Sequence, residues 1–267
     1  MRWSAIPRAD RSRSLRSSQL VRMSTGDRAA TTALLRWYVD MGADEALAPE
    51  PLNRLAADSP PQEQVPSEPA AVVAGQQAPA TTLEELRAEV EGFRGCALRT
   101  DATRTVFADG NPEAGLMLIG EAPGREEDRI GLPFVGSAGK LLDQMLAAIG
   151  RDRTSAYITN VVFWRPPNNR TPTDEEMATC LPLVRTHVAL VRPQAILLLG
   201  AAAARVLLGT RLGISKLRGQ WREIPIEGIP PVPVLPTFHP AFLLRQPARK
   251  ADAWDDLRNL KRRLDGS

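Results

Sequence analysis

Short apolar runs alternate with segments of helical periodicity from residue 82 to residue 264. Four runs, rich in apolar and β-branched residues, are typical of buried strands: LMLIG (116–120), AYITNVVFW (156–164), AILLLG (195–200) and PVLPTFH (233–239). Around them, apolar residues recur every three or four positions, which predicts helices over 82–90, 136–150, 171–191 and 250–264. Thr82 and Glu85 have the pattern of a capping box at the start of the first helix.

Four buried strands separated by helices indicate a mostly parallel sheet, because parallel neighbours need crossover connections and helices then cover both faces. The sequence therefore predicts an α/β protein with three layers, α/β/α, around a central four-stranded, mostly parallel sheet. We assign this domain to residues 81–267.

The first 80 residues follow a different pattern. Residues 1–22 are rich in Arg and Ser and lack apolar periodicity, so we interpret them as a disordered basic arm, with Met23 as a candidate start of the protein. Apolar spacing within residues 23–44 predicts an amphipathic helix. Residues 45–80, rich in Ala, Pro, Glu and Gln, are typical of a flexible linker.

Composition narrows the class of protein. The chain has 267 residues, of which 43% are hydrophobic and 24% charged, as in a globular protein. No apolar run approaches the roughly 20 residues that cross a bilayer, and no apolar secretory core is visible, although a transit peptide stays open. With two cysteines no disulfide framework is indicated, and we expect a monomer in the bacterial cytoplasm.

Charge gives a weak indication of the partner. Residues 91–267 hold 24 basic and 19 acidic residues, a net charge of +5, whereas the whole chain carries +3. A mildly basic region suits a phosphate-rich partner. Charges of this size are also common in proteins that never contact nucleic acid, so charge alone decides nothing.

Candidate functional residues follow each predicted strand. In an open parallel sheet, ligands bind beyond the carboxyl ends of the strands. The residues found there are the GEAPG loop at 120–124, Asn160 with RPP at 165–167, Gly200, and His239 with PAFLLR. Each feature also has a purely structural explanation: GEAPG could be an ordinary turn, Asn160 could cap a turn, and His239 could be a buried core histidine. The functional interpretation gains weight because all of them converge on one edge of one sheet.

Three longer motifs resemble family 4 of the uracil-DNA glycosylase superfamily. They are GEAPGREEDRIGLPFVGSAGKLLD, YITNVVFWRPPNNRTPTDEE and TFHPAFLLR, which keep the family's order and spacing. The resemblance covers roughly residues 83–264. It implies the fold predicted above and a DNA-repair enzyme that hydrolyses the N-glycosidic bond of uracil in DNA and leaves an abasic site.

The resemblance also implies roles for particular residues around an extruded base. The amide of Asn160 would pair with O4 and N3–H of uracil, an arrangement that cytosine mismatches. Phe134 would stack on the base, and His239 would donate to O2 as negative charge develops there. The substrate-binding residues of the first loop would be Gly120, Glu121 and Ala122.

Glu121 is the candidate that positions the attacking water. Family 1 enzymes use an aspartate one residue later in the equivalent loop, and that position is Ala122 here. The role of Glu121 in water activation is therefore open, and stabilisation of the leaving base would carry most of the catalysis.

DNA contacts are expected around the same edge. After His239, an apolar side chain would enter the space left by the flipped base, with a cation near a phosphate, although packing onto the core is an alternative. The amides at a helix start and an arginine after the second strand are further candidates. The predicted DNA-binding residues are Ser137, Gly139, Arg165, Phe242, Leu243, Leu244 and Arg245.

Most family 4 members hold a [4Fe–4S] cluster on four cysteines. The matching positions here are Cys96, Arg99, Trp164 and Cys180, so two of the four are thiols. We predict that the chain holds no metal or other cofactor, that Arg99 and Trp164 fill the space by packing and cation–π contact, and that both cysteines are buried.

Other functions fit parts of the sequence. A related branch binds uracil-DNA covalently through a histidine in a basic insert after the second strand, but FWRPPNNRTPTDEE contains neither feature. A non-catalytic nucleic-acid binder would need neither Asn160 nor His239. A nucleotide-binding protein would show a Walker lysine or G-x-G-x-x-G, and the GEAPG loop has neither.

Overall fold

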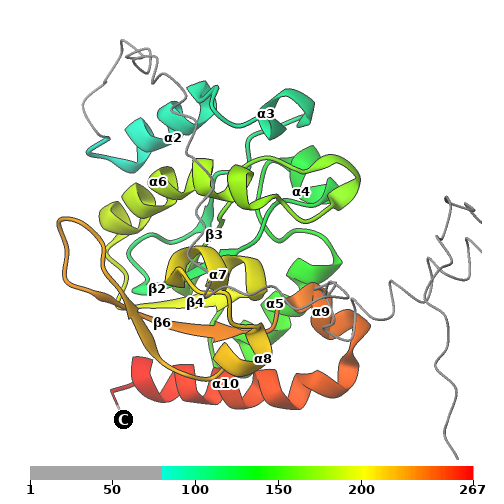
Figure 1. The fold of residues 1–267 in the computed structure, drawn as a ribbon. Coiled ribbons are helices and arrows are strands. Elements are labelled where there is room, and N and C mark those ends of the chain that lie inside the picture. The colour runs from blue at the N-terminus through cyan, green and yellow to red at the C-terminus, as the bar shows by residue number, and fades with distance from the viewer. Residues whose placement is uncertain (1–79, 267) are drawn as a thin grey trace, which may run out of the picture. The chain divides into compact units, whose positions relative to one another are not determined.

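The computed structural model describes residues 80–266. The basic arm, the amphipathic helix and all but the last residue of the linker predicted from the sequence lie outside these residues. A six-stranded sheet forms the centre of the described part, in the order β1-β3-β2-β4-β6-β5 (Figure 1). Its strands are β1 (Asp109–Gly110), β2 (Leu116–Gly120), β3 (Tyr157–Asn160), β4 (Ala195–Leu199), β5 (Arg222–Ile224) and β6 (Val232–Thr237).

The four predicted strands are confirmed as β2, β3, β4 and β6, and they pair in parallel. Three predictions extended too far at the carboxyl end, by one residue at β4, by two at β6 and by four at β3, which ends at Asn160 rather than at Trp164. Beyond that point the amides of Val161 and Val162 bond to the carbonyls of Gly120 and Glu121 in the neighbouring loop. These bonds tie the ends of β2 and β3 together.

The two edge strands were missed by the sequence analysis. β1 pairs antiparallel with β3, and β5 pairs antiparallel with β6, so the sheet is mixed. With two and three residues, these strands are too short to show an alternating pattern.

Helices cover both faces of the sheet (Figure 1), which confirms the three layers. Met117 and Ile119 of β2 belong to the core beneath α2, α6 and α7, whereas Leu116 and Leu118 belong to the core beneath α5 and α10. No helix within residues 80–266 is long and apolar enough to span a membrane. The bounds of the covering helices are α2 (Leu83–Gly92), α5 (Ser137–Ala148), α6 (Asp174–Val191), α7 (Ala201–Leu208) and α10 (Lys250–Leu264).

The helix starts follow from local side-chain chemistry. Thr82 and Glu85 form the predicted capping box of α2, and Thr173 and Glu176 form another at α6. The sequence analysis did not predict α7 or four shorter helices, one of which directly follows His239. The four shorter helices are α3 (Leu98–Asp101), α4 (Arg125–Ile130), α8 (Ile214–Leu217) and α9 (Pro240–Arg245).

The topology opens a crevice at the carboxyl ends of β2 and β3. The connection that leaves β2 runs through α5 on one face, and the connection that leaves β3 runs through α6 on the other. Because neighbouring connections diverge there, the loops leave room for a ligand between them.

Three of the four residues at the family's cluster positions pack into the hydrophobic core. Cys96 and Cys180 are buried, as expected. Trp164 is also buried, stacks on Phe93 with ring centroids 6.1 Å apart, and donates from Nε1 to Thr105 Oγ1 over 3.1 Å. The expectation of a cation–π contact by Arg99 was wrong, because its guanidinium binds the carbonyl of Glu91 instead.

A buried ion pair anchors α10 to the end of β6. Asp256 accepts hydrogen bonds from Arg218 at 2.7 and 3.0 Å and from the Thr237 hydroxyl at 2.7 Å. Thr237 lies two residues before His239, so this network fixes the strand end that carries the candidate histidine. Removing Asp256 would leave the mostly buried Arg218 guanidinium with only the more distant Asp252 carboxylate, at 3.7 Å, as a charge partner.

We therefore expect the substitution Asp256→Ala to lower the free energy of unfolding by about 3 kcal/mol. The matched control is Asp255→Ala on the same helix, where the carboxylate is exposed and pairs with Arg258 at 3.6 Å. That change should cost less than about 0.5 kcal/mol. Urea unfolding of both variants measures the difference, and equal losses would contradict the assigned role of the buried network.

Candidate active site

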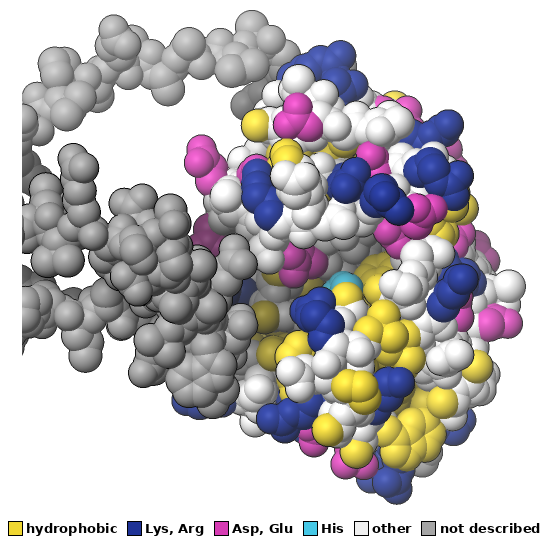
Figure 2. Space-filling model, turned by 90° about the vertical axis from the view of Figure 1, so that its right-hand side faces the viewer, with side chains coloured by type: hydrophobic (Ala, Val, Ile, Leu, Met, Phe, Trp, Pro, Cys, Tyr) yellow, Lys and Arg dark blue, Asp and Glu magenta, His cyan; other side chains and the backbone are white. Residues whose placement is uncertain are grey.

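A cavity of about 440 Å³ opens at the carboxyl ends of the strands. Figure 2 shows it as a hollow with a histidine at its floor and Lys and Arg side chains around it. Its walls come from the loops after β2, β3 and β6, together with α4, α9 and the start of α5. The residues that line it are 121–124, 127, 134, 138, 160, 166, 169–171, 239, 241, 242 and 245.

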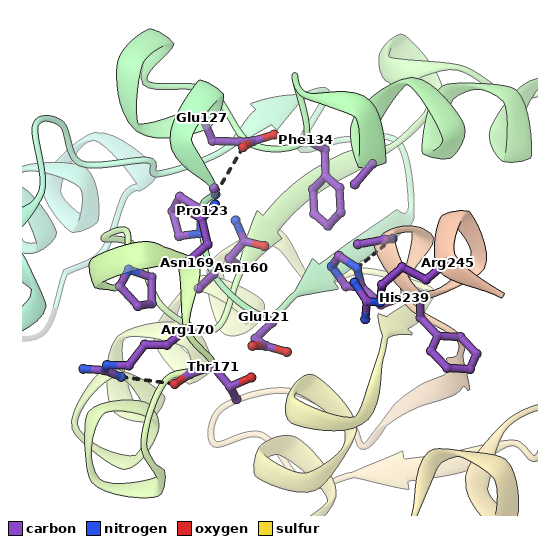
Figure 3. Close-up of a pocket in the computed structure, with 16 residues that line it drawn as sticks. Glu121, Pro123, Glu127, Phe134, Asn160, Asn169, Arg170, Thr171, His239 and Arg245 are labelled. Carbon is purple, nitrogen blue, oxygen red and sulfur yellow. Dashed lines mark hydrogen bonds between the residues drawn. The ribbon is translucent and has the colours of Figure 1, made fainter. Parts of the chain in front are cut away.

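The structure brings the main predicted residues together in this cavity. Asn160, Phe134 and His239 all line it (Figure 3), and the rings of Phe134 and His239 have centroids 5.6 Å apart. Gly120 lies beneath them: a Cβ atom there would come within 2.4 Å of Asn160 Oδ1 and 2.5 Å of Phe134 Cζ. The absence of a side chain at this position therefore lets the amide and the aromatic ring approach each other.

Asn160 presents a buried amide to the cavity. It is the last residue of β3, paired in register with Gly120, and its side chain is almost fully enclosed. Its Oδ1 atom has no hydrogen-bond partner among the described residues. Because buried acceptors nearly always have a partner, a ligand with an N–H donor would complete this site.

His239 is held in one neutral tautomer. It is the N-cap residue of α9, and its Nδ1 accepts a hydrogen bond from the amide of Ala241 at 3.1 Å. The ring proton therefore resides on Nε2. Burial, together with the positive charge of Arg245, lowers the pKa of His239 to about 4. At neutral pH the side chain is an uncharged N–H donor.

Gly200, which follows β4, makes room for this histidine. Its φ of +97° lies in the region that favours glycine, and a Cβ atom there would come within 2.9 Å of His239 Cβ. The residue supports the site although it does not line the cavity.

Glu121 places a carboxyl group in the same cavity. Burial raises its pKa above the ordinary value, while a hydrogen bond from Thr171 and the charges of Arg205 and Arg245 act in the opposite direction. Figure 3 shows the Glu121 carboxyl beside Thr171, facing the open space. A carboxyl in this position can hold a water molecule or a polar group of a ligand.

The predicted DNA-binding residues differ in whether they line the cavity, are exposed beside a lining residue in the sequence, or are buried in the core. Phe242 and Arg245 line the cavity, and Leu244 is 43% exposed on the same helix. Leu243 is 1% exposed and packs in the core, so the expectation that it contacts DNA was wrong. Arg165 lies outside the lining and donates to Asn169 Oδ1 over 2.6 Å.

The amides directly before α5 bind a carboxylate of the protein, close to the predicted phosphate contacts at Ser137 and Gly139. The Glu127 carboxylate accepts hydrogen bonds from the amides of Val135 and Gly136, at 2.9 and 2.8 Å, directly before α5. The amides of Ser137 and Gly139 are not the ones that Glu127 binds, so a phosphate contact at these two residues stays a prediction.

Sequence reasoning missed five lining residues: Glu127, Ala138, Asn169, Arg170 and Thr171. Arg170 and Thr171 belong to the NNRT stretch directly after the RPP motif, and their position beyond a strand end was the available signal. Glu127 gave no such signal, because it binds the amide of its own helix cap, Gly124, and the amides of Val135 and Gly136 in the following turn.

Comparison with known proteins agrees with this geometry. Residues 107–258 match the model of the uracil DNA glycosylase superfamily. A type-4 uracil-DNA glycosylase of Thermotoga maritima is 41% identical over 164 residues, which are 61% of this chain and 83% of that protein. The type-4 enzyme of Archaeoglobus fulgidus is 38% identical over 183 residues, which are 67% of this chain and 92% of that protein. The chain therefore belongs to the uracil-DNA glycosylase superfamily.

Proposed function

We propose that this protein is a uracil-DNA glycosylase that flips uracil out of DNA and hydrolyses its N-glycosidic bond, leaving an abasic site. One observation carries the proposal: the Asn160 Oδ1 atom, which no described residue pairs with, the Phe134 ring and the His239 imidazole converge on one cavity. We also propose that the enzyme acts as a monomer in the cytoplasm.

Asn160 would recognise the Watson–Crick edge of the base. Its Oδ1 atom would accept from N3–H of uracil, and its amide nitrogen would donate to O4. Cytosine offers an unprotonated ring nitrogen and an amino group at these places, so both contacts would be mismatched and a buried acceptor left unpaired. Phe134 would stack on the face of the base.

His239 would stabilise the leaving group. When the bond between C1′ and N1 breaks, its electron pair stays on uracil and places negative charge on O2. The Nε2–H of a neutral imidazole donates to that oxygen without giving up its proton. A water oxygen then bonds to C1′ on the opposite face of the sugar, and the proton released from the water balances the uracil anion.

Glu121 would hold the attacking water, with Thr171 orienting its carboxyl group. Contact with DNA would come from Arg245 and Arg165 at phosphates, and from Leu244 and Phe242 at the space left by the base. Arg245 and Phe242 line the cavity, Leu244 is exposed on the same helix, and Arg165 directly precedes Pro166 of the lining.

The protein's donor set does not fit a four-cysteine iron–sulfur cluster. The chain contains two cysteines, and residues 80–266 hold no group of three or more His, Cys, Asp and Glu side chains placed to bind a metal. Trp164 occupies the core at a cluster position, with its indole bonded to Thr105. We therefore propose that the fold is held here by aromatic packing and that no step of the reaction involves a metal.

Substitution of the two recognition residues tests the proposed reaction. His239→Ala and Asn160→Ala should each lower the rate of uracil excision by about a hundredfold or more, because each removes a buried hydrogen bond to the base. The measurement uses a uracil-containing oligonucleotide and alkali cleavage of abasic sites. Asn111→Ala, at an exposed asparagine, is the control. Full activity in either pocket variant would remove that residue from the mechanism.

The role of Glu121 is tested by the pH dependence of kcat/KM. An ionised Glu121 would be needed to hold water, so activity should fall as pH drops through its raised pKa, above the ordinary value of about 4.3. In Glu121→Gln the rate should be lower and the acid limb should shift toward pH 4, where His239 gains its proton. Glu126→Gln, at a partly exposed carboxylate outside the cavity lining, should leave the profile unchanged. If the acid limb of the pH profile did not move in Glu121→Gln, Glu121 would not be the group that holds the water.

Anaerobic purification tests the proposed absence of a cluster. We expect colourless protein with no iron–sulfur absorbance, and uracil excision that a strong iron chelator does not change. A type-4 enzyme purified in parallel serves as the reference. Stoichiometric iron in this protein would refute the proposal.

A further inference from the structure

The turn that carries Phe134 has a backbone conformation that aromatic residues rarely adopt. Phe134 has a φ of +55°, in the left-handed region, and its side chain is 5% exposed. Such a conformation costs free energy and persists only where the surroundings hold it. The chain around the turn must therefore contain the groups that keep the ring over the cavity.

Arg153 holds the carbonyl side of this turn. It lies in a short 3₁₀-helix (Arg153–Ser155) before β3, and its guanidinium donates to the carbonyl of Phe134 through Nη2 and to that of Pro133 over 3.1 Å through Nη1. Asp109 at 2.6 Å and Asp143 at 2.9 Å orient the guanidinium from the other side. The planar guanidinium of an arginine has several donors in fixed directions, so it can bind two carbonyls and two carboxylates at once.

The amide side of the turn is held by charge of the opposite sign. The Glu127 carboxylate accepts from the amides of Val135 and Gly136, and also from that of Gly124 over 3.1 Å. Gly139 closes the remaining side, since a Cβ atom there would overlap the Phe134 carbonyl oxygen at 1.7 Å. The peptide groups that flank Phe134 are thus fixed by a cation, an anion and a helix backbone.

We propose that Arg153 is a positioning residue for base recognition, acting through the peptide of Phe134 without touching the substrate. The inference rests on the proposed function and extends it to a residue outside the cavity lining. Without the guanidinium, the turn relaxes out of the left-handed region, and the ring leaves its place beside Asn160 and Gly120.

A double-mutant cycle on kcat/KM for uracil excision tests the coupling. Arg153→Ala should lower kcat/KM by about a hundredfold, since small displacements of a positioning group have effects of this size. In a Phe134→Ala background, the same change should cost less than about twofold, because the ring that Arg153 positions is gone. Arg153→Lys keeps the charge but not the fork, and should fall between wild type and Arg153→Ala.

The control is Arg151→Ala, two residues away, where the guanidinium contacts Ser155 and Asp265 instead of the turn. This variant should keep full activity. Urea unfolding of every variant separates lost stability from lost positioning. If the losses from Arg153→Ala and Phe134→Ala multiply in the double variant, Arg153 does not act through Phe134 and the proposal is wrong.

A crystal structure of Arg153→Lys gives a readout that does not depend on activity. We expect φ of residue 134 to leave the left-handed region, or the ring to move away from Gly120. A ring that keeps its place would overturn the positioning role, even if the wild-type protein excised no uracil. A wild-type protein without excision activity, but with a displaced ring in the variant, would contradict the proposed function alone.

Discussion

An amide oxygen without a partner, buried at the end of β3, is the constraint around which the site is built. Folding removes Asn160 Oδ1 from water, and none of the described residues repays that loss with a hydrogen bond. The cavity in front of it is therefore complete only with a ligand that donates at this point. The need for an N–H donor at this oxygen also makes the site selective, because a base without that donor would leave the oxygen buried and unpaired.

The fold satisfies this constraint through backbone more than through side chains. Parallel pairing places Gly120 directly beside Asn160, and the missing side chain at 120 admits the Phe134 ring. Gly200 does the same for His239 from the next strand end. The histidine then caps its own helix, which leaves its second ring nitrogen as the donor toward the cavity. The ends of the four parallel strands thus determine where the recognising atoms of Asn160 and His239 lie.

The sequence predicted what depends on short-range pattern and could not predict what depends on distant backbone contacts. Strand ends located Asn160 and His239, and periodicity located α10 with the bounds that the structure gives. Leu243 and Leu244 are adjacent in one apolar stretch, so the sequence did not show that one is buried and the other exposed. Arg153 was missed because its partners are carbonyl groups twenty residues earlier.

A crystal structure of the protein with the free base uracil would test the central claim most directly. We expect N3 of the bound uracil to lie within hydrogen-bond distance of Asn160 Oδ1. The face of the base should contact the Phe134 ring, and its O2 atom should point toward His239 Nε2. Uracil bound in any other orientation, or an Asn160 amide that pairs with protein atoms instead, would contradict the account.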